Sequence, residues 1–131
     1  YDGGPFFSAD GSQITWRRFS LDGATAEIHT MDLASGEERQ ITRMGVMSWA
    51  PYFHPSGKKI IFSSNHHSER GWDFQLFMIN EDGTGLEQIT TESRFNAFAM
   101  WSPDGKKIVF SSNRNNGGTR DTNVFIADWK D

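Results

Sequence analysis

The sequence contains no cysteine, and only four of its 131 residues are proline. Without cysteine the chain can form no disulfide, no thiolate nucleophile and no cysteine zinc site, so the sequence gives no information about its redox compartment. No apolar run approaches the roughly 20 residues that a membrane-spanning helix requires, and no signal-peptide pattern is present. We therefore expect no membrane insertion.

Blocks of like charge are also missing. The formal net charge is −4, and no run of lysine or arginine is longer than a pair. The chain therefore lacks the basic surface that nucleic acids or anionic membranes require, and neither is an expected partner. Aromatic residues make up 14% of the chain and glycine contributes 13 residues, a mixture that favours short strands and tight turns over helix.

One pattern occurs three times along the chain. Residues 100–113 read MWSPDGKKIVFSSN, residues 52–65 read YFHPSGKKIIFSSN, and residues 6–16 follow more loosely as FFSADGSQITW. Their turn glycines are Gly11, Gly57 and Gly105, so the spacing is 46 and then 48 residues. Periods of about 40 to 50 residues are typical of propeller blades or helical arrays.

Each repeat predicts four antiparallel strands, with the fourth missing from the last repeat. Ser-Ala-Asp-Gly at 8–11 and Ser-Pro-Asp-Gly at 102–105 suit type I turns between a first and a second strand. Consecutive apolar residues in the second strands of the later repeats indicate cover on both faces. The first strand of the first repeat is predicted at 5–7, after an irregular start. The second strands are predicted at 13–16, 59–62 and 107–110, the third strands at 27–32, 75–80 and 123–128, and the polar fourth strands at 38–42 and 86–90.

The block WSPDGKKIVFSSN at 101–113 resembles the repeats of TolB-type β-propellers, and the resemblance covers essentially the whole chain. It implies an all-β fold, a β-propeller built from four-stranded antiparallel blades, as a single segment over 1–131. The blades are expected at about 1–44, 45–93 and 94–131, the last without its outer strand. The phrases at 1–8 and 125–129 look more like the peptidase-associated variety. His54, Ser56 and Ala9 depart from the usual Ser, Asp and Pro of the repeat turn.

TolB-type propellers generally have six blades, so three blades imply half of a ring. An open fragment would expose the apolar faces of its first and last blades. We expect either a homodimer, in which two copies of three blades close a six-bladed ring, or half of a longer chain. The resemblance also implies a bacterial protein in the periplasm or secreted from the cell.

No pattern in the sequence indicates catalysis or a cofactor. Neither a Gly-x-Ser-x-Gly elbow nor a glycine-rich phosphate loop is present. His66 and His67 lie near Glu69 and Asp73, but adjacent histidines on a loop do not match the His-Glu-x-x-His metal helix. The run 80–85 alternates oxygen donors as a calcium loop does, but its twelfth position is Thr91 rather than Glu. We therefore expect no enzyme activity, no catalytic residue, no metal and no cofactor.

Binding is expected on the long loops between second and third strands, about residues 17–26, 65–73 and 113–121. In a propeller these loops share one face with the connections between blades. Exposed arginine with aromatic neighbours is the composition of binding hot spots, although ordinary solvated loops with Trp49 and Phe95 packed beneath them are the alternative. The candidate ligand-binding residues on this face are Arg43, Trp49, His66, His67, Arg94, Phe95, Asn96 and Arg114.

The sequence thus favours a non-enzymatic module that binds or scaffolds a protein or peptide at the channel mouth. The alternative is the accessory propeller of a hydrolase, which gates or orients substrate for a catalytic domain.

Overall fold

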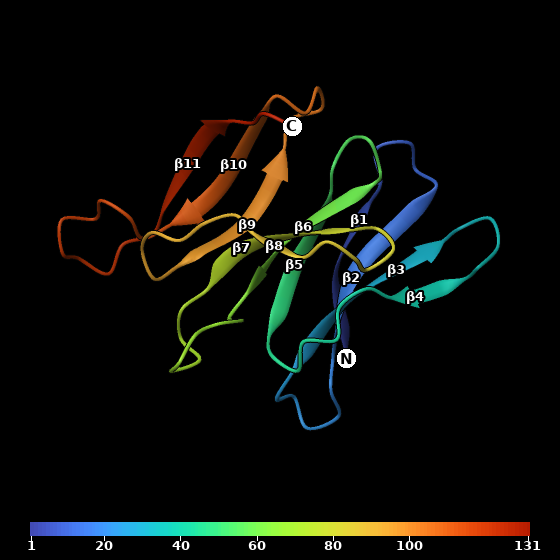
Figure 1. The fold of residues 1–131 in the computed structure, drawn as a ribbon, viewed down its shortest axis with the longest axis horizontal. Coiled ribbons are helices and arrows are strands. Elements are labelled where there is room, and N and C mark those ends of the chain that lie inside the picture. Colours follow the sequence, from blue (N-terminus) through green and yellow to red (C-terminus); the bar gives the residue numbers. More distant parts are fainter.

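The computed structural model describes all residues 1–131 and contains three antiparallel sheets that follow one another along the chain (Figure 1). We call the sheets blades 1, 2 and 3. Blade 1 consists of β1 (Asp2–Phe7), β2 (Gln13–Phe19), β3 (Ala26–Asp32) and β4 (Glu38–Gln40). Blade 2 consists of β5 (Ser48–Phe53), β6 (Lys59–Ser64), β7 (Gln75–Asn80) and β8 (Glu87–Gln88). Blade 3 consists of β9 (Asn96–Trp101), β10 (Lys107–Ser112) and β11 (Asn123–Asp128).

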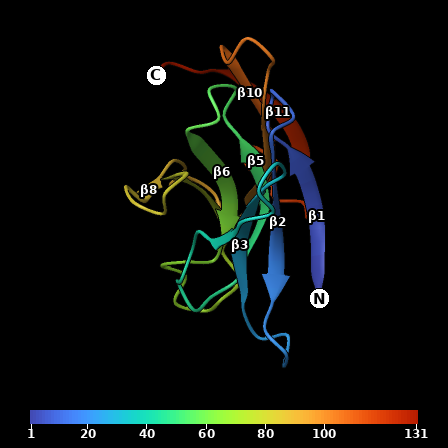
Figure 2. The same ribbon diagram turned by 90° about the vertical axis from the view of Figure 1, so that its right-hand side faces the viewer.

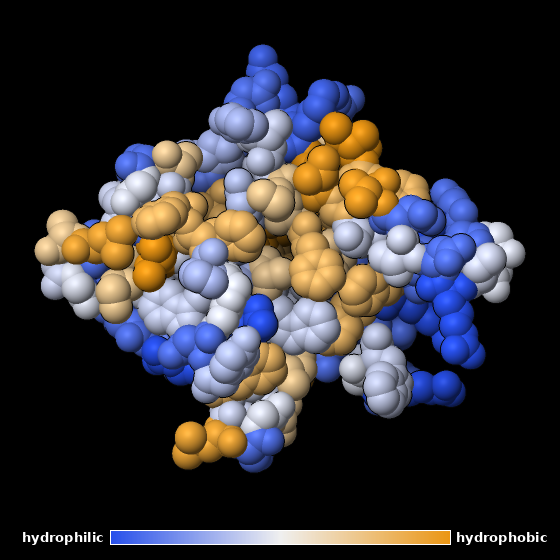
Figure 3. Space-filling model, turned by 180° about the vertical axis from the view of Figure 1, so that it is seen from behind, coloured by the Kyte–Doolittle hydropathy of each residue, from blue (hydrophilic) through white to orange (hydrophobic).

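The strands of each blade are hydrogen-bonded in chain order, and blade 3 lacks a fourth strand, as the repeat predicts. In the side view the strands run roughly parallel to one another, with β1 at one side of the molecule and β8 at the other (Figure 2). Seen from behind, the molecule is hollowed at its centre, with hydrophobic side chains gathered around the hollow, and we call this the concave side (Figure 3). No helix long and apolar enough to cross a membrane is present.

Blade 1 differs from the sequence prediction mainly in its first two strands, and its fourth strand ends at Gln40 rather than at residue 42. β1 begins at Asp2 rather than Pro5, because Asp2 and Gly3 pair with Arg18 and Arg17. For the same reason β2 continues to Phe19, so the first long loop spans 20–25 and not 17–26. The polar residues that suggested a loop are strand residues here because main-chain pairing holds them on both sides.

A bulge interrupts the first strand of every blade. Gly4, Ala50 and Phe98 occupy the same position in their repeats and have φ angles of 66°, 51° and 59°. This left-handed conformation is easy for glycine but strained for alanine and phenylalanine. At Phe98 the neighbouring blade helps to hold it, because the Phe98 N–H donates to Ser63 Oγ at 3.1 Å.

The hydrophobic core lies between blades in two layers. Ile60 and Phe62 of β6 pack with Ile28 of blade 1, while Ile61 packs with Trp101 of blade 3. All three consecutive β6 residues are fully buried, so the prediction that this strand is covered on both faces is confirmed. In blade 3 the same prediction is wrong for one face, because Val109 is 36% exposed with no further sheet beside it.

The turn between β5 and β6 in blade 2 lacks the usual Asp, and a different side chain accepts its hydrogen bonds. In blade 3 the Asp104 carboxylate accepts the Ser102 hydroxyl and the Lys106 N–H, as the turn assignment predicts. In blade 2 the His54 Nδ1 accepts the Ser56 N–H at 3.1 Å and lies 2.8 Å from Ser56 Oγ. The imidazole nitrogen thus provides the acceptor that Asp provides elsewhere.

The Asp10 turn predicts an acid sensitivity. The Ser12 N–H and the hydroxyls of Ser12 and Ser8 all donate to this exposed carboxylate, and they lower its pKa to about 2. Because the folded pKa lies below the ordinary value of 3.8, this contribution to stability is present above pH 4 and is lost as the pH falls toward 2. In urea denaturation between pH 5 and 2, Asp10→Ala should show a shallower loss of stability than the wild type. Identical slopes would contradict this assignment.

Candidate ligand-binding site

A hollow of about 650 Å³ lies where the long loop of blade 2, residues 65–74, meets the connection 89–95 that leads to blade 3. We call it the loop-face site. It is lined by His67, Glu69, Arg70, Trp72, Asp73, Arg94, Phe95 and Asn113.

Backbone bonds join the two segments that form this site. The Phe74 N–H donates to the Arg94 carbonyl at 2.9 Å, and the Asn96 N–H donates to the Phe74 carbonyl at 2.9 Å. The Asn of the repeated Ser-Ser-Asn sequence secures the connection as well, since Asn113 Oδ1 accepts the Phe95 N–H at 3.1 Å. Asn65 bonds Met47 in the same way one blade earlier. The repeat itself therefore holds the site's walls in place.

The charged side chains of the loop-face site form no ion pairs with one another. None of the ion pairs in the chain involves Glu69, Arg70, Asp73 or Arg94. The Arg70 and Arg94 side chains are exposed and donate no hydrogen bond, so both guanidinium groups are free to bind an incoming carboxylate.

Aromatic rings extend the site toward the concave side of the molecule. Trp72 is 80% exposed at its rim. Phe95 lies 6.2 Å from Phe74 and 6.3 Å from Phe98, between ring centroids. Trp49 packs on Phe74 at 4.1 Å. We call Trp49, Phe74, Phe95 and Phe98 the aromatic cluster. Its outermost ring, Phe98, is 52% exposed.

Asn96 and Arg114 lie beneath the site and contact each other. Asn96 is fully buried, and its Nδ2 donates to Gln75 Oε1 at 2.9 Å and to the Glu92 carbonyl at 2.8 Å. Arg114 Nη2 donates to Asn96 Oδ1 at 2.9 Å, with its guanidinium 5.0 Å from the Phe110 ring centroid. The bond from Asn96 to Gln75 of β7 joins blade 3 to blade 2, and neither Asn96 nor Arg114 lines the hollow.

Of the two adjacent histidines, one lines the loop-face site and the other is half-buried beneath it. His67 is exposed and lines the hollow, whereas His66 is half-buried with its ring 5.7 Å from Phe77. Burial, followed by the nearby His67, lowers the pKa of His66, so it is neutral at pH 7. No three side chains of the His, Asp or Glu type converge as a metal site would require.

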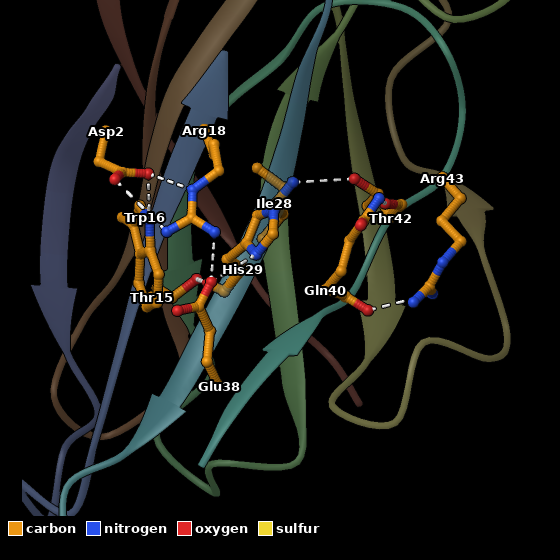
Figure 4. A network of polar contacts seen from close by, with 10 residues as sticks. All are labelled: Asp2, Thr15, Trp16, Arg18, Ile28, His29, Glu38, Gln40, Thr42 and Arg43. Atoms are coloured by element: carbon orange, nitrogen blue, oxygen red, sulfur yellow. Dashed lines mark hydrogen bonds and ion pairs between the residues drawn. The ribbon is translucent and has the colours of Figure 1, made fainter. Parts of the chain in front are cut away.

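The remaining candidate, Arg43, lies away from the others on the connection between blades 1 and 2. Its Nη1 donates to the Gln40 carbonyl at 3.2 Å, and the neighbouring Thr42 Oγ1 accepts the Ile28 N–H at 2.9 Å (Figure 4). Of the eight candidates the structure brings His67, Arg94 and Phe95 to the hollow and Trp49 to the adjoining aromatic cluster.

Sequence reasoning missed Trp72 and Arg70 as lining residues of the site. Neither residue is among the ligand-binding residues that the sequence predicts. The available signal was an isolated tryptophan inside a polar loop rich in charge and glycine, where no strand pattern offers it a core position.

Comparison with known proteins identifies the repeat. Residues 4–126 match the TolB beta propeller domain. Solved structures of TolB from Acinetobacter baumannii and of a putative TolB from Agrobacterium tumefaciens are each 28% identical to this chain, with TM-scores of 0.78 and 0.79. They cover 96% and 98% of the chain, which spans 29% and 45% of their own lengths.

The β-propeller domain of the Trilobed protease from Pyrococcus furiosus is also similar, with a TM-score of 0.66 over 98% of this chain and 39% of its own. At 19% identity this likeness concerns the fold alone. The expected all-β propeller architecture is confirmed by these matches together with the three antiparallel sheets. The chain belongs to the family of TolB beta propeller domains.

Proposed function

We propose that this chain is a non-enzymatic binding module that holds a protein or peptide segment at the loop-face site. The observation that supports the proposal most directly is the exposed Trp72 in the same hollow as Arg70 and Arg94, whose guanidinium groups form no ion pair or hydrogen bond. Tryptophan and arginine are the residues most enriched in binding hot spots. The site is also built on two connections that a rigid pair of sheets holds in place.

The lining indicates an extended ligand with two kinds of side chain. Arg70 and Arg94 fit a carboxylate, and the rings of Phe95 and Phe98 offer an apolar surface that continues toward the concave side. A peptide with an acidic residue followed by an aromatic or aliphatic one would satisfy both parts. Glu69 and Asp73, which also line the hollow, would disfavour a uniformly acidic ligand.

The same site would serve an accessory propeller that orients a peptide substrate for a hydrolase, which is the second role compatible with this fold. No contact in the structure favours that role over simple binding, so we keep binding as the proposal. Family membership supports a periplasmic or secreted location.

A displayed peptide library selected on the immobilised chain tests the proposal. Selected peptides, measured by fluorescence anisotropy, should bind Trp72→Ala and Arg94→Ala at least about tenfold more weakly than the wild type, because each change removes a central contact. Raising the salt concentration should weaken binding to the wild type more than to Arg94→Ala.

Leu21→Ala is the matched control, because Leu21 is a fully exposed loop residue of blade 1, away from the loop-face site. Binding to it should equal that of the wild type. The proposal is wrong if no peptide is enriched, or if the enriched peptides bind the Trp72 and Arg94 variants as well as the wild type.

A further inference from the structure

We propose that a second hollow, at the opposite end of β6 from the loop-face site, binds a small organic anion with a flat apolar body, such as an aromatic carboxylate. We call this hollow, which lies between blades 2 and 3, the lysine groove. Its volume is about 420 Å³, within the range of roughly 300 to 1,000 Å³ that is usual for small-molecule sites. No residue lines both hollows, so the inference is independent of the ligand proposed for the loop-face site.

The chain contains an equivalent hollow between blades 1 and 2, of about 450 Å³, which provides an internal reference. Strand register matches three lining positions of blade 2 to three of blade 1: Lys59, Met78 and Glu87 hold the places of Gln13, Thr30 and Arg39. Main-chain bonds match Trp129 to Glu81. The N–H of each donates to the carbonyl of the residue that precedes the second strand of its blade, at 2.7 and 2.9 Å.

The two hollows differ in chemistry although they occupy the same place in the repeat. The hollow between blades 1 and 2 is lined by polar side chains alone, among them three carboxylates and one arginine. In the lysine groove Met78, Ile89 and Trp129 form an apolar wall, and the basic residues outnumber the acidic ones. Because the same junction is formed with either lining, the fold itself does not require lysine or tryptophan at these positions.

The positive charge of the lysine groove is not neutralised within the chain. The three lysines that line it take part in none of the ion pairs; they are Lys58, Lys59 and Lys130. Two carboxylates line the groove as well, Glu87 and Asp131, and Asp131 Oδ1 already accepts the Trp129 indole N–H at 2.8 Å. A hollow with an excess of one charge attracts a ligand of the opposite sign, here an anion.

His54 adds a neutral donor and extends the aromatic lining. Its Nδ1 accepts the Ser56 N–H, so the proton of the neutral ring is on Nε2. Nε2 lies 3.3 Å from Asp131 Oδ1 but forms no hydrogen bond. The His54 ring meets Trp101 edge-on at 4.9 Å between centroids, and Trp101 meets Trp129 in the same way at 5.4 Å. A flat ring bound in the groove would continue this series of aromatic contacts.

Titration of the chain with naphthoate, followed by amide-proton NMR, tests the proposal. The largest shifts are expected at the N–H groups of Lys58 and Lys59 and at the indole N–H of Trp129, because these residues line the groove. Naphthamide keeps the rings without the charge, and acetate keeps the charge without the rings. Each should bind at least about tenfold more weakly than naphthoate, because each lacks one of the two contacts.

Variants that borrow residues from the equivalent hollow identify the groove as the site. Lys59→Gln and Trp129→Glu introduce the residues that blades 1 and 2 carry at these positions, Gln13 and Glu81, so the repeat accommodates both. Each should weaken naphthoate binding at least about fivefold. Lys106→Gln removes the same charge from an exposed position outside the groove and should bind naphthoate as the wild type does.

The proposal is overturned if naphthamide binds as tightly as naphthoate, because the lysines would then contribute nothing. It is equally overturned if Lys59→Gln binds naphthoate as tightly as the wild type, or if the shifts map to residues outside the groove. Absence of saturable naphthoate binding up to about 5 mM would have the same consequence.

Discussion

Phe62→Asp is expected to abolish the cooperative unfolding transition of this chain. Phe62 is fully buried between blades 1 and 2, where its ring stacks 6.0 Å from that of Phe77 and packs with Ile28. Removing the ring alone typically costs about 3 to 5 kcal/mol. A carboxylate among these apolar residues adds a further desolvation cost of several kcal/mol. The sum approaches the whole stability of a domain, about 5 to 15 kcal/mol.

Thermal unfolding followed by circular dichroism measures this effect. Leu33→Asp, on the exposed turn between β3 and β4, provides the control and should melt within a few degrees of the wild type. Phe110→Asp at the equivalent position of blade 3 should be milder, because Arg114 lies over that ring and can pair with the new carboxylate. A cooperative melt of Phe62→Asp near the wild-type temperature would show that the layer between blades 1 and 2 is not a packed core.

The sequence predicts the later repeats better than the first. Blade 2 has consecutive apolar residues in β6 and β7, so the pattern alone identifies strands covered on both faces, and the burial of Ile60, Ile61 and Phe62 confirms it. The first repeat carries Arg17 and Arg18 where the others have serine. These residues suggest a loop by composition, but pairing of β2 with β1 and β3 overrides local preference.

Val109 shows what a hydrophobic pattern means physically. Its surroundings in sequence match those of Ile61, yet Ile61 is fully buried and Val109 is not. The pattern reports which face a strand is suited to bury, and a separate observation is needed to show what covers that face. In blade 3 no further sheet lies beside that face, so Val109 stays partly exposed.

The candidate site was predicted at the level of the face but not of the individual side chain. Loops 65–74 and 89–95 do meet, and His67, Arg94 and Phe95 do line one hollow. Whether a loop side chain points outward depends on contacts formed only after folding. Asn96 is predicted on the loop face of the connection between blades 2 and 3, but it begins β9 and is fully buried, where its amide bonds Gln75 and the Glu92 carbonyl.

Asn96→Leu is expected to lower the free energy of unfolding by about 2 to 4 kcal/mol, although leucine is the more hydrophobic residue. The change leaves Arg114 Nη2 without its acceptor. It also leaves Gln75 Oε1 and the Glu92 carbonyl without the Asn96 N–H groups that donate to them. Polar groups left buried without partners cost more than the added apolar contact returns. The melting temperature should fall by about 10 °C, since 1 kcal/mol corresponds to roughly 3 to 6 °C in a chain of this size.

Urea denaturation of Asn96→Leu, Arg114→Ala and the double variant separates this network from a simple loss of packing. The double variant should be more stable than the sum of the single effects predicts, by about 1 to 2 kcal/mol, because each single change already breaks the same bond. Additive effects would show that Asn96 and Arg114 act independently. Asn96→Asp should also destabilise, because its carboxylate would face the Gln75 and Glu92 oxygens that Asn96 now bonds through its N–H groups. Asp2 begins β1 as Asn96 begins β9, and a carboxylate is stable there because the indole of Trp16 and the guanidinium of Arg18 both donate to it.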